Sequence, residues 1–187
     1  MKRATSVVLL VGAALCFPTA GGAQYLRRNP SLRKSTVPAV QNLRSLAGCW
    51  KGRGPHGDAR LFYEVVSDGT ALVEYLRPGA NDTPQITVYY LDGETLMAHH
   101  FCYYGSQIRM KAEPASDPKL LVFKLQDATN LSADQHENHM TYIKLSFPDP
   151  DHLEADWGQF DRGKELPSYF SLTRVSEGCK GTDLSTW

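Results

Sequence analysis

The sequence predicts an all-β protein: a ten-stranded antiparallel up-and-down barrel, with a short N-terminal helix closing one end. Three observations support this fold class. Short runs of strand-forming residues recur at intervals of roughly 12 residues, turn residues separate these runs, and no helical run lies between them. A parallel sheet would need such helical connections. With 187 residues, the chain has the length of a single domain.

The N-terminus has the pattern of a secretory signal. Lys2 and Arg3 precede an apolar stretch over residues 6–17, and small residues lead to a cleavage site after Ala23. We therefore expect residues 1–23 to be removed and the protein to be secreted or periplasmic. No later apolar run approaches the ~20 residues of a membrane helix, so we expect no stable membrane insertion after cleavage.

Residues 24–39 form a basic stretch with few apolar side chains, which predicts a flexible leader; an arm that binds anionic surfaces is the alternative. A barrel domain over residues 40–180 and a tail over residues 181–187 complete the organisation. Six of the twenty basic residues precede residue 40, whereas all twenty acidic residues follow it. The rest of the chain therefore has a net charge of −6, which argues against nucleic acid as a partner.

Periodicity predicts the elements of the barrel domain in order. A short helix is indicated by Val40, Leu43 and Leu46, which lie three apart. Strands are then expected over residues 49–54, 59–66, 71–77, 85–91, 95–104, 107–113, 119–126, 140–147, 152–160 and 166–175. Glycine adopts positive φ at little cost, which predicts tight hairpins at Ser67-Asp68-Gly69, Asp92-Gly93 and Asp161-Arg162-Gly163. The longest break, residues 127–139, is polar and predicts a surface loop or lid.

The even number of strands is expected to bring two cysteines to the same end of the barrel, where they can form a disulfide. Ten up-and-down strands bring the first and last strands together antiparallel, so that the start of one meets the end of the other. Cys49 opens the first strand, and Cys179 lies just past the last. In an oxidising compartment we expect a Cys49–Cys179 disulfide, with Cys102 left as a buried free thiol. The alternative is that all three cysteines stay reduced.

The motif Gly48-Cys49-Trp50, after a short helix and at the start of the first strand, resembles the G-x-W signature of the calycin barrels: lipocalins, fatty-acid-binding proteins and nitrobindins. In those families the Trp packs against a basic residue of the final strand, and Arg174 occupies that place here. The resemblance implies that the Trp50 ring and the Arg174 guanidinium stack and close one barrel end. Nitrobindins hold haem through a His near the chain end, but residues 168–172 contain no His.

A closer similarity covers nearly all of residues 45–179 and is to a group of uncharacterised secreted bacterial proteins with this barrel. The motifs that carry it are Leu91-Asp92-Gly93, His100-Phe101-Cys102, Gln107-Ile108-Arg109-Met110 and Asp127-Ala128-Thr129-Asn130-Leu131. This similarity implies the fold and brings no known activity.

The strand over residues 95–104 is the most informative about a site. Residues two apart share a face, so His100 and Cys102 lie together, opposite His99. Following the resemblance, we predict that the face with His100 and Cys102 points inward. A ligand site is then expected inside the barrel, with Tyr90, His100, Cys102, Gln107, Arg109 and His139 as its lining. The alternative is that His100 and Arg109 are structural, with hydrogen bonds to carbonyls or a carboxylate.

Other chemistry is less well supported by the residues. Cys102 beside His100 fits an activated thiol, but no third orienting group is evident, and a buried apolar cysteine is commonly inert. His136-Glu137-Asn138-His139 has the spacing of zinc ligands, although this spacing is frequent in polar surface loops. We therefore predict no catalytic residue, no metal site and no cofactor.

The predicted barrel and its lining are compatible with three functions. The first is a secreted barrel that binds a small, partly apolar ligand in its interior. The second is an isomerase or hydrolase that uses His100 and Arg109 on the same barrel. The third is a filled barrel that serves as a protein-interaction module through its leader or lid. The residues favour the first function and leave the protein partner unknown.

Overall fold

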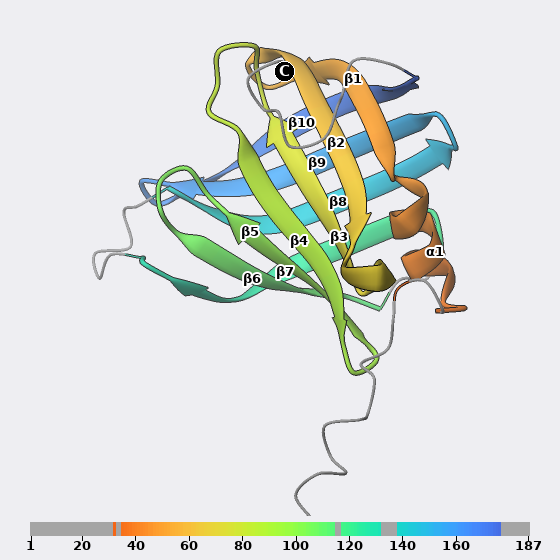
Figure 1. Ribbon diagram of the computed structural model, residues 1–187. Helices are drawn as coiled ribbons and strands as arrows, with labels where there is room; N and C mark the ends of the chain where they lie inside the picture. Colours follow the sequence, from red (N-terminus) through yellow and green to blue (C-terminus); the bar gives the residue numbers. More distant parts are fainter. Residues whose placement is uncertain (1–31, 33–34, 115–116, 132–137, 177–187) are drawn as a thin grey trace, which may run out of the picture.

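The computed structural model describes residue 32 and residues 35–114, 117–131 and 138–176. One short helix, α1 (Pro38–Ser45), precedes ten antiparallel strands that close into a barrel (Figure 1). Every strand pairs with its neighbour in sequence, and β1 pairs with β10 to close the sheet. The predicted fold class is therefore confirmed, and the architecture is consistent with a calycin-like fold.

The ten predicted strands are all present, with small differences at their ends. They are β1 (Gly48–Gly54), β2 (Gly57–Val66), β3 (Ala71–Arg77), β4 (Gln85–Asp92), β5 (Thr95–Phe101), β6 (Gln107–Ala112), β7 (Leu120–Thr129), β8 (His139–Asp149), β9 (His152–Asp161) and β10 (Lys164–Val175).

The clearest difference is at β5, which ends at Phe101 and not at residue 104. The amide of Gly105 donates to the carbonyl of Cys102, and the amide of Cys102 donates to the carbonyl of Ser106. These bonds form a turn, and Gly105 has the positive φ that such a turn requires. The polar break after β7 is correspondingly shorter than predicted, because β7 continues to Thr129.

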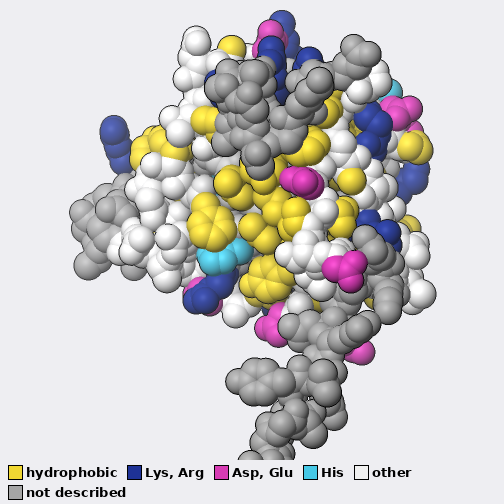
Figure 2. All heavy atoms as spheres, in the orientation of Figure 1, with side chains coloured by type: hydrophobic (Ala, Val, Ile, Leu, Met, Phe, Trp, Pro, Cys, Tyr) yellow, Lys and Arg dark blue, Asp and Glu magenta, His cyan; other side chains and the backbone are white. Residues whose placement is uncertain are grey.

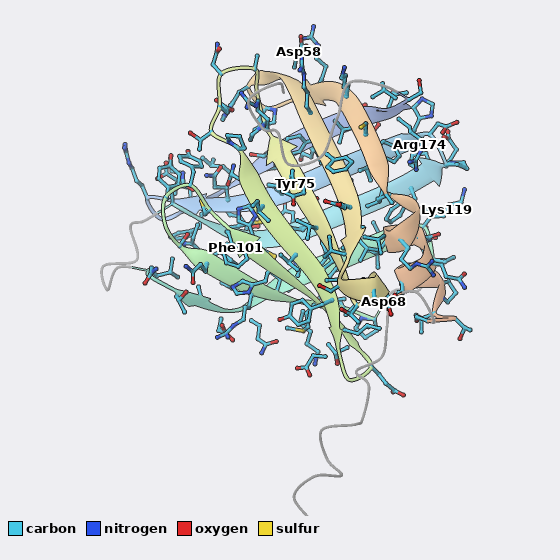
Figure 3. The ribbon with its side chains drawn as sticks, in the orientation of Figure 1. Asp58, Asp68, Tyr75, Phe101, Lys119 and Arg174 are labelled. Atoms are coloured by element: carbon cyan, nitrogen blue, oxygen red, sulfur yellow. The ribbon has the colours of Figure 1, made fainter. Side chains whose placement is uncertain are left out.

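The seam between β1 and β10 closes the barrel at the α1 end. Trp50 lies opposite Arg174 in the register of the two strands, and the guanidinium carbon of Arg174 is 4.3 Å from the centre of the Trp50 ring. The predicted stack is therefore confirmed. Figure 3 shows Arg174 near α1, while Asp58, at the start of β2, lies at the other end of the barrel.

Apolar side chains fill most of the barrel interior. Inward positions alternate along the strands, as in Leu72 and Leu76 of β3 or Leu121 and Phe123 of β7. Leu32, which belongs to the predicted leader, is also fully buried against this core. The interior is therefore a packed core over much of its length, and a ligand can enter only where side chains leave space.

The outer surface differs in polarity around the barrel. Figure 2 shows hydrophobic side chains gathered on the face formed by β2 to β5. One outward row across these four strands consists of Phe62, Tyr75, Ile86 and Phe101. The outward residues of β8 and β9 include the charged and exposed Lys144 and Glu154. Alternation of apolar and polar residues consequently gives a weaker signal in β3 and β4 than elsewhere.

Several predictions fall outside the described residues. Residues 1–23 and Cys179 are among them, so the signal sequence and the Cys49–Cys179 disulfide stay predictions. Cys49 lies opposite Val175 in the register of β1 and β10, which places it at the strand end from which the chain leads on to Cys179. No described helix is both long and apolar enough to cross a membrane.

Candidate functional site

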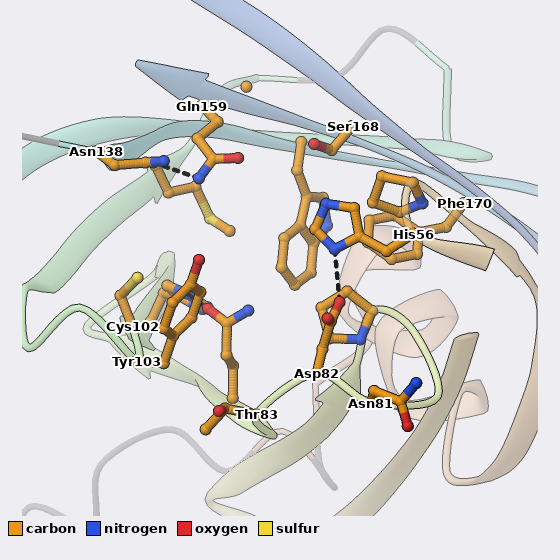
Figure 4. Close-up of a pocket in the computed structure, with 17 residues that line it drawn as sticks. His56, Asn81, Asp82, Thr83, Cys102, Tyr103, Asn138, Gln159, Ser168 and Phe170 are labelled. Atoms are coloured by element: carbon orange, nitrogen blue, oxygen red, sulfur yellow. Dashed lines mark hydrogen bonds and ion pairs between the residues drawn. The ribbon is translucent and has the colours of Figure 1, made fainter. Parts of the chain in front are cut away.

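A pocket of about 250 Å³ opens at the barrel end opposite α1. Connections between successive strands meet there, because an up-and-down barrel places every second turn at the same end. The turn between β1 and β2, the loop between β3 and β4, and the residues just before β8 all contribute (Figure 4). The lining residues are Pro55, His56, Pro78, Asn81, Asp82, Thr83, Gln85, His100, Cys102, Tyr103, Asn138, Met140, Trp157, Gly158, Gln159, Ser168 and Phe170.

The floor of this pocket is aromatic. Trp157 of β9 and Phe170 of β10 are buried, with ring centres 5.2 Å apart. The imidazole of His100 meets the Trp157 ring edge-on at 5.6 Å, and Met140 of β8 adds a flexible apolar side chain. These residues offer flat surfaces to a ring-shaped ligand.

His100 is fixed and neutral. It is 1% exposed, its Nδ1 lies 3.0 Å from the hydroxyl of Thr87, and its Nε2 lies 3.1 Å from Oε1 of Gln85. Burial, with a smaller contribution from the charge of His99, lowers the pKa of His100 to about 3. Because both ring nitrogens are occupied, His100 is placed to orient Gln85 and not to transfer a proton to a ligand.

A row of polar side chains runs beneath the pocket around the inside of the barrel. In register, Tyr63 lies opposite Glu74, Glu74 opposite Thr87, and Thr87 opposite His100. Tyr89 donates a hydrogen bond to Oε2 of Glu74 at 3.0 Å. Together these residues form a polar band within a largely apolar interior.

Glu74 is the buried acid of this band. Desolvation raises the pKa of its carboxyl, and the neighbouring hydroxyls of Tyr63, Tyr89 and Thr87 oppose that shift. Glu74 is 0% exposed, and its Oε1 has no hydrogen bond of good geometry within the described residues. Burial thus makes the carboxyl of Glu74 easier to protonate than an exposed carboxyl.

The rim of the pocket carries two polar pairs. Nδ1 of His56 lies 2.5 Å from Oδ2 of Asp82, which ties the β1–β2 turn to the β3–β4 loop. The amide of Gln159 donates to Oδ1 of Asn138. Figure 4 shows these two pairs on different sides of the pocket, with Tyr103 beside Cys102 and apart from both pairs. The rim therefore combines amides, hydroxyls and one His–Asp pair.

Of the six predicted lining residues, two line the pocket and four do not. His100 and Cys102 line the pocket, as expected from the chosen face of the strand. His139 is the first residue of β8 and packs against Phe160, with ring centres 5.2 Å apart; its neighbours Asn138 and Met140, and not His139 itself, line the pocket. Whether any of these residues binds a ligand stays a prediction.

The predicted inward positions of Tyr90, Gln107 and Arg109 are wrong. Ile108 lies opposite the inward His100, and directly opposed residues share a face, so Gln107 and Arg109 point outward. Arg109 forms an ion pair with Asp127 on the outer surface. Likewise Tyr89 is the buried residue of its pair and Tyr90 is outside. Arg109 and His100 therefore lie on opposite sides of the barrel wall and do not form one site.

Sequence reasoning missed Glu74, Thr87, Gln85 and the rim residues. Glu74 had a readable signal, because it lies between Leu72 and Leu76 in an alternating strand and so shares their inward face. The rim residues had none, because His56 and Asp82 lie in two irregular connections whose contact strand periodicity does not predict. His136 of the H-x-x-H motif lies outside the described residues.

No protein-family model matches the chain, and no curated protein has a similar sequence. The site must therefore be interpreted from its own geometry.

Proposed function

We propose that this protein is a secreted or periplasmic calycin-like barrel that binds a small, partly apolar ligand at its open end. The observation that carries the proposal is the pocket itself: an aromatic floor beneath a polar rim, at the one barrel end that α1 leaves open. Concave sites with apolar walls and a few convergent polar groups are the usual form of small-molecule sites.

The arrangement supports binding better than catalysis through His100. Both nitrogens of that imidazole are engaged, and Arg109 is on the outer surface. Within the described residues, no group of three or more His, Cys, Asp or Glu is placed to hold a metal ion. The pattern of residues 1–23 supports an exported protein, which would meet its ligand outside the cytoplasm.

Two serines of β10 allow a matched test. Ser168 faces the pocket, and Ser171 is exposed on the outer surface of the same strand. We expect protein purified from its native host to release a small molecule on denaturation, detected by mass spectrometry. Ser168→Trp should fill the pocket and abolish that release, whereas Ser171→Trp should leave it unchanged. Equal release from both variants would contradict the proposal.

A further inference from the structure

We infer that the pocket takes an uncharged ring compound of roughly ten non-hydrogen atoms, whose inner end carries a carbonyl-type hydrogen-bond acceptor, and that it discriminates against carboxylates and against organic cations. This inference rests on the proposed function, because it names the ligand class of the same pocket. The size of the pocket, its charge and its hydrogen-bonding groups each restrict the ligand separately.

The volume limits the ligand to one substituted ring. A cavity of ~150 Å³ holds benzene, and pockets for drug-sized ligands have ~300–1,000 Å³. The volume of about 250 Å³ lies between these values. The floor adds a preference for a flat molecule, because the aromatic side chains of Trp157 and Phe170 line it.

The charge of the lining opposes both kinds of ion. No Lys or Arg is among the described lining residues, and Asp82 is their only carboxylate. A carboxylate ligand would lose its hydration without gaining a cationic partner, which is costly.

A cation would find only one acid among the described lining residues, and that acid is already paired. The carboxylate of Asp82 lies against Nδ1 of His56 at 2.5 Å, at the rim and not at the floor. The deeper groups His100, Gln85 and Trp157 carry no negative charge. The positive charge of a buried organic cation would therefore have no negative partner at the depth where the ring of the ligand fits.

The inner polar contact is a donor. Oε1 of Gln85 is held by Nε2 of His100, so the amide –NH₂ of Gln85, a double donor, is left for a ligand at the pocket floor. The indole N–H of Trp157 is a further buried donor with no hydrogen-bond partner among the described residues. A ligand acceptor beside Gln85 would meet a donor and no competing Lys or Arg among the described lining residues.

Three probes of the same shape test the charge argument: benzamide, benzoate and benzamidinium. We expect benzamide to bind at pH 7 with a Kd at least tenfold lower than that of either ion, measured by ligand-observed NMR titration. Asp82→Asn should narrow the gap between benzamide and benzoate. Asp58→Asn, which alters an exposed acid paired with Arg53 at the same barrel end, should not change it.

Gln85→Leu tests whether the side-chain amide of Gln85 donates a hydrogen bond to the ligand. We expect this change to weaken benzamide binding about tenfold while toluene, which has the ring without an acceptor, still binds. Retained toluene binding shows that the variant keeps its pocket.

Benzoate or benzamidinium binding as tightly as benzamide would overturn the inference and leave the pocket as a binding site. Equal benzamide affinity in wild type and Gln85→Leu would overturn the inference that the ligand carries an acceptor at its inner end. If none of the four probes binds, the inference falls, and the Ser168→Trp and Ser171→Trp comparison decides separately whether the pocket holds any ligand.

Discussion

The two ends of the barrel differ in how their polar groups are satisfied. At the closed end, Arg174 donates to the carbonyls of Ser45, Ala47 and Pro150 at 2.6, 2.9 and 3.1 Å, and its guanidinium stacks on Trp50. The indole of Trp50 donates to the carbonyl of Leu46 at 2.8 Å. At the open end, the indole of Trp157 finds no partner in the described part of the chain, and the lining encloses space.

This difference separates stability from function on one scaffold. The closed end satisfies the last carbonyls around α1 with a cation, which also suits the negative end of the helix dipole. Gly48 permits this arrangement, because its φ is +121° and a Cβ there would lie 3.3 Å from Nη1 of Arg174. The open end lines its pocket with the amide of Gln85 and the aromatic side chains of Trp157 and Phe170, as a binding site requires.

The largest effect we expect concerns acid stability and the open end. His100 has a folded pKa of about 3 against an ordinary value of 6.5, so the unfolded chain takes up a proton that the folded protein excludes. Stability from this group is therefore present above pH 6.5 and is lost as the pH falls toward 3, by at most ~4–5 kcal/mol. His100→Gln should flatten this dependence in urea unfolding measured between pH 7 and pH 4.

His99 supplies the matched control for that measurement. It is the neighbouring residue on the opposite face of β5, and burial lowers its pKa to a lesser degree, with the charge of Arg109 acting in the same direction. His99→Gln should keep most of the wild-type pH dependence. A His100→Gln protein with the wild-type slope would show that the neutral, buried imidazole does not govern acid sensitivity.

At the closed end, Arg174→Met should lower the free energy of unfolding by about 2–3 kcal/mol, because three backbone carbonyls lose a charged donor and Trp50 loses its stacked cation. Denaturant unfolding measures the loss. Arg53→Met is the control, since Arg53 is exposed and its pair with Asp58 is worth at most ~1 kcal/mol. Equal losses in the two variants would contradict the role of Arg174 in closing the barrel.

A smaller effect compares the two tryptophans directly. Trp50→Phe removes a buried hydrogen bond to the carbonyl of Leu46, whereas Trp157→Phe removes a donor that has no partner among the residues described. Both changes shrink a buried ring, so Trp50→Phe should cost about 1 kcal/mol more than Trp157→Phe in unfolding free energy. Equal costs, or a larger cost at Trp157, would contradict the comparison between the ends.

The sequence could predict the architecture because its signals are local. Strand-forming runs and glycine turns predict the ten strands. The number of strands in turn predicts the pairing of β1 with β10, where Trp50 and Arg174 lie. The faces of β4 and β6 were harder to predict. In β4 the outward Ile86 and Val88 are more apolar than the inward Gln85 and Thr87, so hydrophobicity indicates the wrong face.

For β6 the cross-strand register decides the question. Once His100 faces inward, its partner Ile108 must do so too, which turns Arg109 to the outside. Neither hydrophobicity nor cross-strand register predicts the rim of the pocket. His56 and Asp82 lie in different connections, 26 residues apart in the chain, and their contact depends on the shape of these irregular loops.

Ligand binding at the open end, and not at the closed end, can be followed in a single spectrum. The indole N–H signals of Trp50 and Trp157 in a ¹H–¹⁵N spectrum report on the two ends of the same molecule. Addition of benzamide is predicted to move the Trp157 signal progressively to saturation while the Trp50 signal stays in place. Movement of the Trp50 signal alone, or of neither signal, would contradict binding at the open end.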